Sequence, residues 1–172
     1  LDAAGALALG AAGACLLAPG LLVLGDASPS ELAGGMAAAL AAYGTVALAV
    51  LAGLGPVGRR RSFGLPNALT LARAVLLAGL AGVSIPGLST PTLAWAVCGL
   101  AVLALVLDGL DGWAARRIGP STRFGALFDQ EVDAATLLAL ATILAVSGKV
   151  GPWVLAIGAW RYAFLAATRI WP

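Results

Sequence analysis

Residues 91–133 read PTLAWAVCGLAVLALVLDGLDGWAARRIGPSTRFGALFDQEVD and hold the pattern that decides the fold. Apolar residues run almost without interruption up to Leu107, and a second apolar run follows Asp133. Between the runs lies a polar stretch that contains Gly119, Pro120 and several charged residues. A helix needs about 20 apolar residues to cross a bilayer, and a break with Gly and Pro favours a loop. The stretch therefore predicts two antiparallel transmembrane helices joined by a short loop.

The same pattern continues outward through the whole chain. Apolar residues make up 61% of the 172 residues and charged residues only 10%, against about 25% in soluble domains. Short breaks rich in Gly, Pro, Ser or charge separate six apolar stretches: 3–25, 32–55, 68–86, 91–115, 124–147 and 151–170. We therefore expect an all-α, polytopic transmembrane helix bundle of about six spans with short loops, and no soluble domain.

The basic residues indicate how these spans are oriented. With six spans, six arginines fall on one side of the membrane and Lys149 falls on the other. The six are Arg59, Arg60, Arg61, Arg116, Arg117 and Arg123. Because cytoplasmic loops accumulate Lys and Arg, we expect both termini and these arginines in the cytoplasm. The expected location is the bacterial inner (plasma) membrane, with the active site facing the cytoplasm.

Acidic residues gather where the fourth apolar stretch ends and the fifth begins. Five of the eight acidic residues of the chain fall between positions 108 and 133. A carboxylate at the centre of a transmembrane helix costs about 2.5 to 3.5 kcal/mol on insertion scales, so acids at this depth are candidates for a functional site. The three-residue and four-residue spacings put Asp108 and Asp111 on one helix face, and Asp129 and Asp133 on another. Because the loop is short, the two faces can meet and four carboxylates would converge.

Such a cluster needs a partner of positive charge, because bare carboxylates would repel one another and hold protons. The chain has no His, and oxygen ligands alone favour Mg²⁺, Mn²⁺ or Ca²⁺. A site shared with substrate phosphates favours Mg²⁺ in particular. Gly112, Ala115 and Gly125 leave room for a flat base or a diphosphate against the helices, although close helix packing is an alternative role for such small residues. The pattern indicates a nucleotide diphosphate bound through metal.

These residues also carry a resemblance to a known family. DGLDGWAAR at 108–116 and GALFDQEVD at 125–133 resemble the signature D-x-x-D-G-x-x-A-R-x8-G-x-x-x-D-x-x-x-D of the CDP-alcohol phosphotransferase family, with all eight defining positions matched. PNALTLAR at 66–73 resembles the P-N-x-x-T-x-x-R stretch that opens the first catalytic span in many members. A helix is expected to start there at the membrane surface, with Asn67 close to the N-cap. The resemblance covers residues 62–172 and implies a membrane transferase of phospholipid biosynthesis.

The resemblance implies roles for individual residues. Two Mg²⁺ or Mn²⁺ ions are expected on Asp108, Asp111, Asp129 and Asp133, and Asp133 is also the expected general base. The expected contacts to CDP are Asn67, Thr70, Asp111, Gly112, Ala115, Arg116 and Gly125. The phosphate of the acceptor is expected to contact Arg161 and Arg169, as in phosphatidylglycerophosphate and phosphatidylinositol-phosphate synthases. Glu131 lies about 200° around the helix from Asp129 and should not join the metal site.

The resemblance also divides the chain and implies a reaction. Residues 1–57 are expected to form two additional N-terminal transmembrane helices, and 58–172 the catalytic region without the last two of the family's six spans. The expected reaction moves the phosphatidyl group of CDP-diacylglycerol to an alcohol, in particular a phosphorylated one, and releases CMP. The expected partners are these two substrates, the lipid bilayer and a second copy of the chain in a homodimer, but no nucleic acid.

Several alternatives stay open. The donor can instead be a CDP-linked head group with diacylglycerol as acceptor, although a neutral acceptor would need no cations such as Arg161. A non-catalytic bundle is a second alternative, and an ion-transporting bundle is a third, although an ion path would need acids distributed in depth. Among single residues, Arg169 can instead extend its charge to the interface, and Arg116 can be a membrane anchor.

Overall fold

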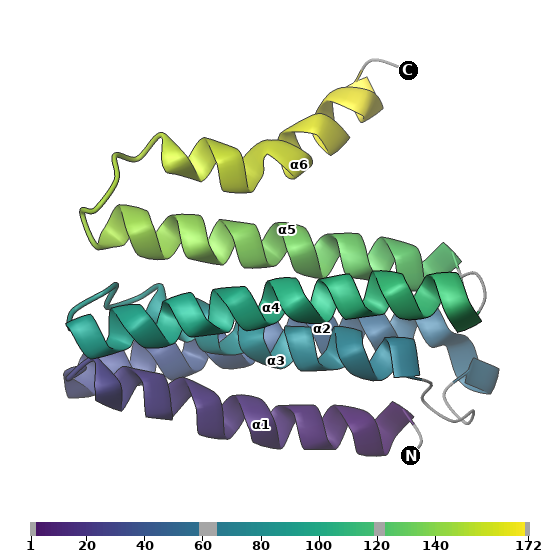
Figure 1. Ribbon diagram of the computed structural model, residues 1–172, viewed down its shortest axis with the longest axis horizontal. Coiled ribbons are helices and arrows are strands. Elements are labelled where there is room, and N and C mark those ends of the chain that lie inside the picture. The colour runs from purple at the N-terminus through teal and green to yellow at the C-terminus, as the bar shows by residue number, and fades with distance from the viewer. Residues whose placement is uncertain (1–2, 59–64, 119–122, 171–172) are drawn as a thin grey trace.

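The computed structural model describes residues 3–58, 65–118 and 123–170. These residues form six α-helices and no strands, which confirms the expected all-α bundle. The helices are α1 (Ala3–Leu24), α2 (Pro29–Gly58), α3 (Leu65–Val83), α4 (Pro91–Ile118), α5 (Arg123–Val146) and α6 (Val154–Ile170). Successive helices run in opposite directions, so that α2 and α4 end where α3 and α5 begin (Figure 1). We call this end of the bundle the site end and the opposite end the loop end.

Three helix starts differ by three residues from the positions that hydrophobicity predicted, namely those of α2, α3 and α6, and α6 begins at Val154 rather than at 151. α2 begins at Pro29, before the apolar run, because Ser28 and Glu31 form a capping box. The amide of Ser28 donates to the Glu31 carboxylate at 2.8 Å, and the amide of Glu31 donates to the Ser28 hydroxyl at 3.4 Å. α3 begins at Leu65, so Asn67 lies in its first turn and the expected position near the N-cap is wrong.

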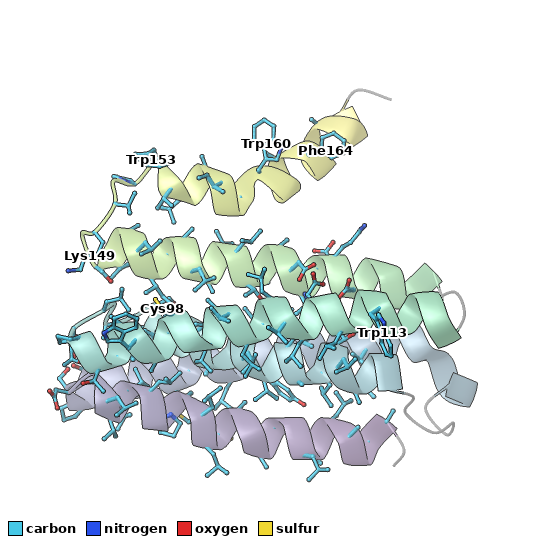
Figure 2. All side chains as sticks on the ribbon, in the orientation of Figure 1. Cys98, Trp113, Lys149, Trp153, Trp160 and Phe164 are labelled. Atoms are coloured by element: carbon cyan, nitrogen blue, oxygen red, sulfur yellow. The ribbon has the colours of Figure 1, made fainter. Side chains whose placement is uncertain are left out.

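The described helices have the surface of a membrane protein. Three of them are long and apolar enough to cross a bilayer, namely α1, α2 over Pro29–Ala52 and α4 over Pro91–Leu110, and α3 contains a shorter apolar helix. Large apolar side chains such as Leu16, Trp95 and Leu105 are exposed on the outside of the bundle. Figure 2 shows Trp160 and Phe164 on the side of α6 that faces away from α5. Contiguous exposed apolar surface of this kind marks contact with lipid or protein.

The bundle is organised around α3, which contacts α1, α2, α4 and α5. Small residues make the closest helix crossings. A Cβ atom on Gly35 of α2 would lie only 2.9 Å from the carbonyl oxygen of Gly82 on α3. In the same way, a Cβ atom on Gly158 of α6 would lie 2.7 Å from the Cα atom of Leu138 on α5. Both crossings therefore depend on the absence of a side chain.

Hydrogen bonds tie the connecting segments together at the loop end. The amide of Leu88 donates to the hydroxyl of Ser147 at 2.6 Å, which joins the α3–α4 and α5–α6 connections. The hydroxyl of Ser89 donates to the carbonyl of Gly25 at 2.5 Å, which joins the α3–α4 and α1–α2 connections. These bonds satisfy polar groups that would otherwise be costly near the membrane, and they connect three segments that are distant in sequence.

Candidate metal centre

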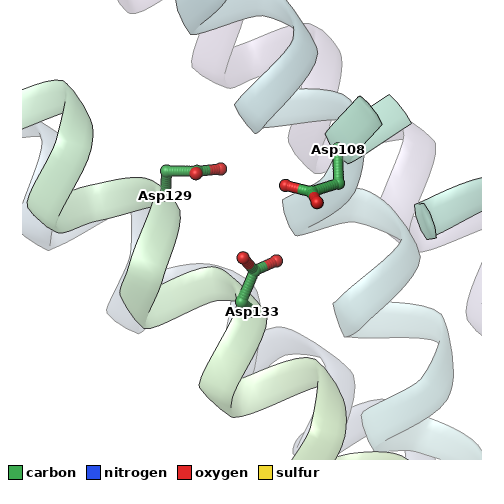
Figure 3. A group of neighbouring side chains, drawn as sticks. All are labelled: Asp108, Asp129 and Asp133. Atoms are coloured by element: carbon green, nitrogen blue, oxygen red, sulfur yellow. The ribbon is translucent and has the colours of Figure 1, made fainter. Parts of the chain in front are cut away.

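Three aspartates from two helices converge in the half of the bundle that lies toward the site end. Asp108 lies on α4, and Asp129 and Asp133 lie on α5, the next helix in the chain (Figure 3). One carboxylate oxygen from each residue lies within 4.8 Å of the other two. The four-residue spacing on α5 directs both of its carboxylates to one side, as the sequence predicted. The two predicted faces therefore meet.

A buried arginine from a third helix lies against this cluster. Arg73 of α3 is only 3% exposed, and its Nη1 atom lies 3.2 Å from Oδ1 of Asp108. Its guanidinium also forms ion pairs with Asp129 and Asp133. The carboxylates are far more accessible than their partner, because the side chains of Asp108, Asp129 and Asp133 are 48%, 30% and 42% exposed. The cluster thus has a buried cation on one side and accessible carboxylate oxygens on the other.

Arg73 was not among the residues expected in the site. It is the last residue of the PNALTLAR stretch, which predicts an interfacial helix. One signal could have identified it, because an arginine that continues into an apolar helix needs an acidic partner. The central packing of α3 between α4 and α5 supplies that partner, and this packing cannot be read from the local sequence.

The donor set fits a hard divalent cation. The three carboxylates carry three negative charges when ionised, and Arg73 offsets only one of them. The described cluster contains oxygen donors alone, which Mg²⁺ and similar ions prefer. Its carboxylate oxygens are accessible enough for an ion that keeps part of its water shell. The three aspartates are therefore able to hold a metal ion.

The structure describes only some of the other residues that were predicted for the site. Thr70, one turn before Arg73 on α3, is buried, and Gly112 lies on α4 one turn after Asp108. Glu131 lies outside the cluster of described carboxylates, as expected. The remaining predicted site residues have side chains outside the described part of the structure: Asn67, Asp111, Ala115, Arg116, Gly125, Arg161 and Arg169.

Known proteins match the part of the chain that contains this site. The profile of a family described as CDP-alcohol phosphatidyltransferase matches residues 63–172, which include α3 to α6. A cardiolipin synthase (CMP-forming) from Oryza sativa subsp. japonica is 36% identical over 117 residues, which are 62% of this chain and 35% of that protein. A CDP-diacylglycerol–glycerol-3-phosphate 3-phosphatidyltransferase from Cereibacter sphaeroides is 34% identical over 95 residues, 55% of this chain and 42% of that protein. The matches thus cover less than half of each relative, and no solved structure matches the chain.

Proposed function

Because this chain belongs to the CDP-alcohol phosphatidyltransferase family, we propose that it moves the phosphatidyl group of CDP-diacylglycerol to an alcohol and releases CMP. The convergence of Asp108, Asp129 and Asp133 inside the region that the family profile matches is the observation that carries this proposal. The name of the CMP-forming relative supports the release of CMP. The name of the second relative includes glycerol 3-phosphate and supports a phosphorylated alcohol as the acceptor. The protein is an integral membrane enzyme of phospholipid biosynthesis.

The aspartates would bind the metal on which this chemistry depends. We assign Asp108, Asp111, Asp129 and Asp133 as ligands of two Mg²⁺ or Mn²⁺ ions. When bound, the ions offset the negative charge of the diphosphate and of the departing CMP. Arg73 holds three of these carboxylates in their converged positions. It acts as a positioning residue, because each of its described partners is itself a proposed ligand.

Asp133 is the proposed general base. Its carboxylate accepts the proton of the acceptor hydroxyl, and the resulting oxygen forms a bond to the phosphorus on the lipid side of the diphosphate. The bond from this phosphorus to the CMP oxygen then breaks, and CMP leaves. The Asp133 side chain is 42% exposed, so an acceptor can reach it. It lies one helical turn further from the α4–α5 loop than Asp129 does, which favours contact with a hydroxyl rather than with CDP.

The remaining contacts follow from the family motif. The CDP moiety is assigned to Asn67, Thr70, Asp111, Gly112, Ala115, Arg116 and Gly125. The acceptor phosphate is assigned to Arg161 and Arg169. Both arginines belong to α6, which packs on α5 and runs back toward the site end (Figure 1). The last turns of α6 lean away from α5 (Figure 1), and the direction of the helix toward the site end supports the assignment.

The placement of the whole protein is also part of the proposal. We assign α1 and α2 as additional N-terminal helices, since they precede the region that the family profile matches. The arginine-rich segments favour the bacterial inner membrane with the site end facing the cytoplasm. A homodimer in the lipid bilayer is the proposed assembly.

A direct assay tests the function. Purified protein in lipid nanodiscs is incubated with Mg²⁺, radiolabelled CDP-diacylglycerol and a panel of alcohols and alcohol phosphates. We expect CMP and a labelled phospholipid with at least one phosphorylated alcohol, and no product after chelation of the metal. A parallel reaction supplies CDP-linked head groups and diacylglycerol. A folded protein that forms product only in the parallel reaction would reverse the assignment of donor and acceptor, and one inactive in both would overturn the proposed function.

A further inference from the structure

Arg73 gives the candidate metal centre a cation of its own, and the two terminal nitrogens of its guanidinium have different partners. Nη1 pairs with Asp108 of α4 and with Asp129 of α5, whereas Nη2 pairs with Asp133 of α5. We infer that Arg73 is the counter-ion of these carboxylates before a metal ion binds, and that a divalent ion then displaces Nη1 while Nη2 keeps its partner. The inference rests on the proposed function and adds to it an exchange of cations at the same carboxylates.

Nη1 lies where an ion shared by α4 and α5 would have to lie. In the described residues no Cα atom of α4 comes within 8 Å of a Cα atom of α5, and both helices pack on α3 instead. The carboxylates of Asp108 and Asp129 extend toward each other across this space (Figure 3). Nη1 lies 3.2 Å from Oδ1 of Asp108 and also pairs with Oδ1 of Asp129. A Mg²⁺ ion that binds both residues at about 2.0 to 2.1 Å needs the same place between them.

The charges of the cluster favour a divalent ion as the replacement. Three ionised carboxylates carry three negative charges and Arg73 offsets one, so that two remain to match a divalent ion. A monovalent ion brings no more charge than the guanidinium that it would displace. The guanidinium is also covalently attached beside the carboxylates, which gives it a high effective concentration there. Arg73 therefore restricts the centre to ions of higher charge.

The second nitrogen keeps a partner for Arg73 after the exchange. The side chain is only 3% exposed, so it cannot turn outward into water unless the helices around it move. A buried guanidinium without any partner would be costly. The pair between Nη2 and Asp133 supplies one carboxylate that stays with Arg73. A carboxylate has two oxygens, so Asp133 can pair with Arg73 and bind a metal ion at the same time.

The first test measures the binding of Mn²⁺ by electron paramagnetic resonance, on purified protein in nanodiscs and without substrate. Arg73→Gln removes the charge but keeps hydrogen-bond donors. We expect it to lower the Kd for Mn²⁺ by about tenfold or more, because a neighbouring cation no longer opposes the ion. The control is Lys149→Ala, which removes the same charge at the loop end (Figure 2) and should leave the Kd unchanged. An unchanged or higher Kd in Arg73→Gln would overturn the proposal.

The second test follows the guanidinium itself in the wild-type protein. Protein with ¹⁵N-labelled arginine side chains is titrated with Mg²⁺, and the signals of Arg73 are identified by their loss in Arg73→Lys. We expect the signal of one terminal nitrogen to shift as the centre binds Mg²⁺, and that of the other to change little. Unchanged signals at saturating Mg²⁺, which would place the ion beside an unmoved guanidinium, would overturn the proposal, as would the loss of both sets of ion pairs.

Neither test depends on catalysis, so failure of the proposed function can be recognised separately. Release of CMP from CDP-diacylglycerol is assayed on the same wild-type preparation. Its absence with every acceptor would refute the proposed function, whereas the Mn²⁺ affinities and the Arg73 signals decide the exchange of cations.

Discussion

Nη1 of Arg73 on α3 lies 3.2 Å from Oδ1 of Asp108 on α4. The same guanidinium also pairs with Asp129 and Asp133 on α5. One buried cation therefore connects three helices and holds the carboxylates together, against their mutual repulsion. Arg suits this position better than Lys, because its planar group presents several donors in fixed directions.

Arg73→Ala should destabilise the metal-free protein. Loss of hydrogen bonds to charged groups costs about 1.5 to 3 kcal/mol, and the three carboxylates would then repel one another. Mg²⁺ should raise the melting temperature of the variant more than that of the wild type, since the ion replaces the missing positive charge. Thermal unfolding with and without Mg²⁺ measures both effects. Arg73→Lys is the matched control and should be intermediate, whereas an equal Mg²⁺ shift in the wild type and Arg73→Ala would contradict the positioning role.

Asp133→Asn should separate catalysis from binding. Loss of a general base lowers turnover by about 10² to 10⁴-fold, but it affects the transition state more than the bound substrate. Binding of the CDP-lipid in the presence of Mg²⁺ should therefore persist. Asp129→Asn is the comparison, and it should weaken both Mg²⁺ binding and turnover. If Asp133→Asn loses binding and turnover equally, Asp133 is chiefly a metal ligand.

Arg161→Ala and Arg169→Ala should weaken the binding of only one substrate, the acceptor. Charge-assisted contacts to a phosphate are worth about 1.5 to 3 kcal/mol each, which corresponds to a rise in the acceptor KM of roughly 10- to 150-fold. The KM for CDP-diacylglycerol should stay the same. Steady-state kinetics with each substrate varied in turn measures the two KM values separately. Strong activity with an unphosphorylated alcohol that Arg161→Ala does not change would refute the acceptor assignment and leave the metal centre unaffected.

Gly35→Ala should destabilise the crossing of α2 and α3. Its Cβ atom would lie 2.8 Å from the Leu22 side chain and 2.9 Å from the carbonyl oxygen of Gly82. Overpacking of this kind costs about 1 to 3 kcal/mol. Gly44→Ala on the same helix is the control, because a Cβ atom there meets nothing within 4 Å, and the higher helix propensity of Ala should stabilise by up to about 1 kcal/mol. Melting temperatures in one detergent compare them, and equal shifts would show that the crossing tolerates a methyl group.

The parts of this structure that the sequence predicts are those that depend on local patterns. Apolar runs predicted six helices, and the spacing of Asp129 and Asp133 predicted a shared face that the structure confirms. The capping box of Ser28 and Glu31 was equally local, but apolar runs alone do not detect it. The role of Arg73 could not be predicted from a local pattern. It depends on the position of α3 between α4 and α5, two helices that follow it in the chain.

An apolar groove between α2, α3 and α5 could not be predicted for a related reason. Its walls come from α2, α3 and α5, and none of these helices has a sequence pattern that marks the position of its neighbours. Alanines such as Ala42 and Ala49 occur throughout the chain, where they allow close packing as readily as they leave space. The spacing of the three helices decides whether such alanines pack closely or leave open space.

The hydrogen bonds at the loop end have a mechanical consequence. Ser147 and Leu88, together with Ser89 and Gly25, fasten three connections to one another, so the helices can shift least where these bonds lie. A small tilt about the loop end produces a displacement that grows along each helix, and the ion pairs of Arg73 must give way before α3, α4 and α5 can separate. The bundle should therefore open at the site end rather than at the loop end. A lipid head group would then enter when whole helices tilt, and not when a surface loop moves aside.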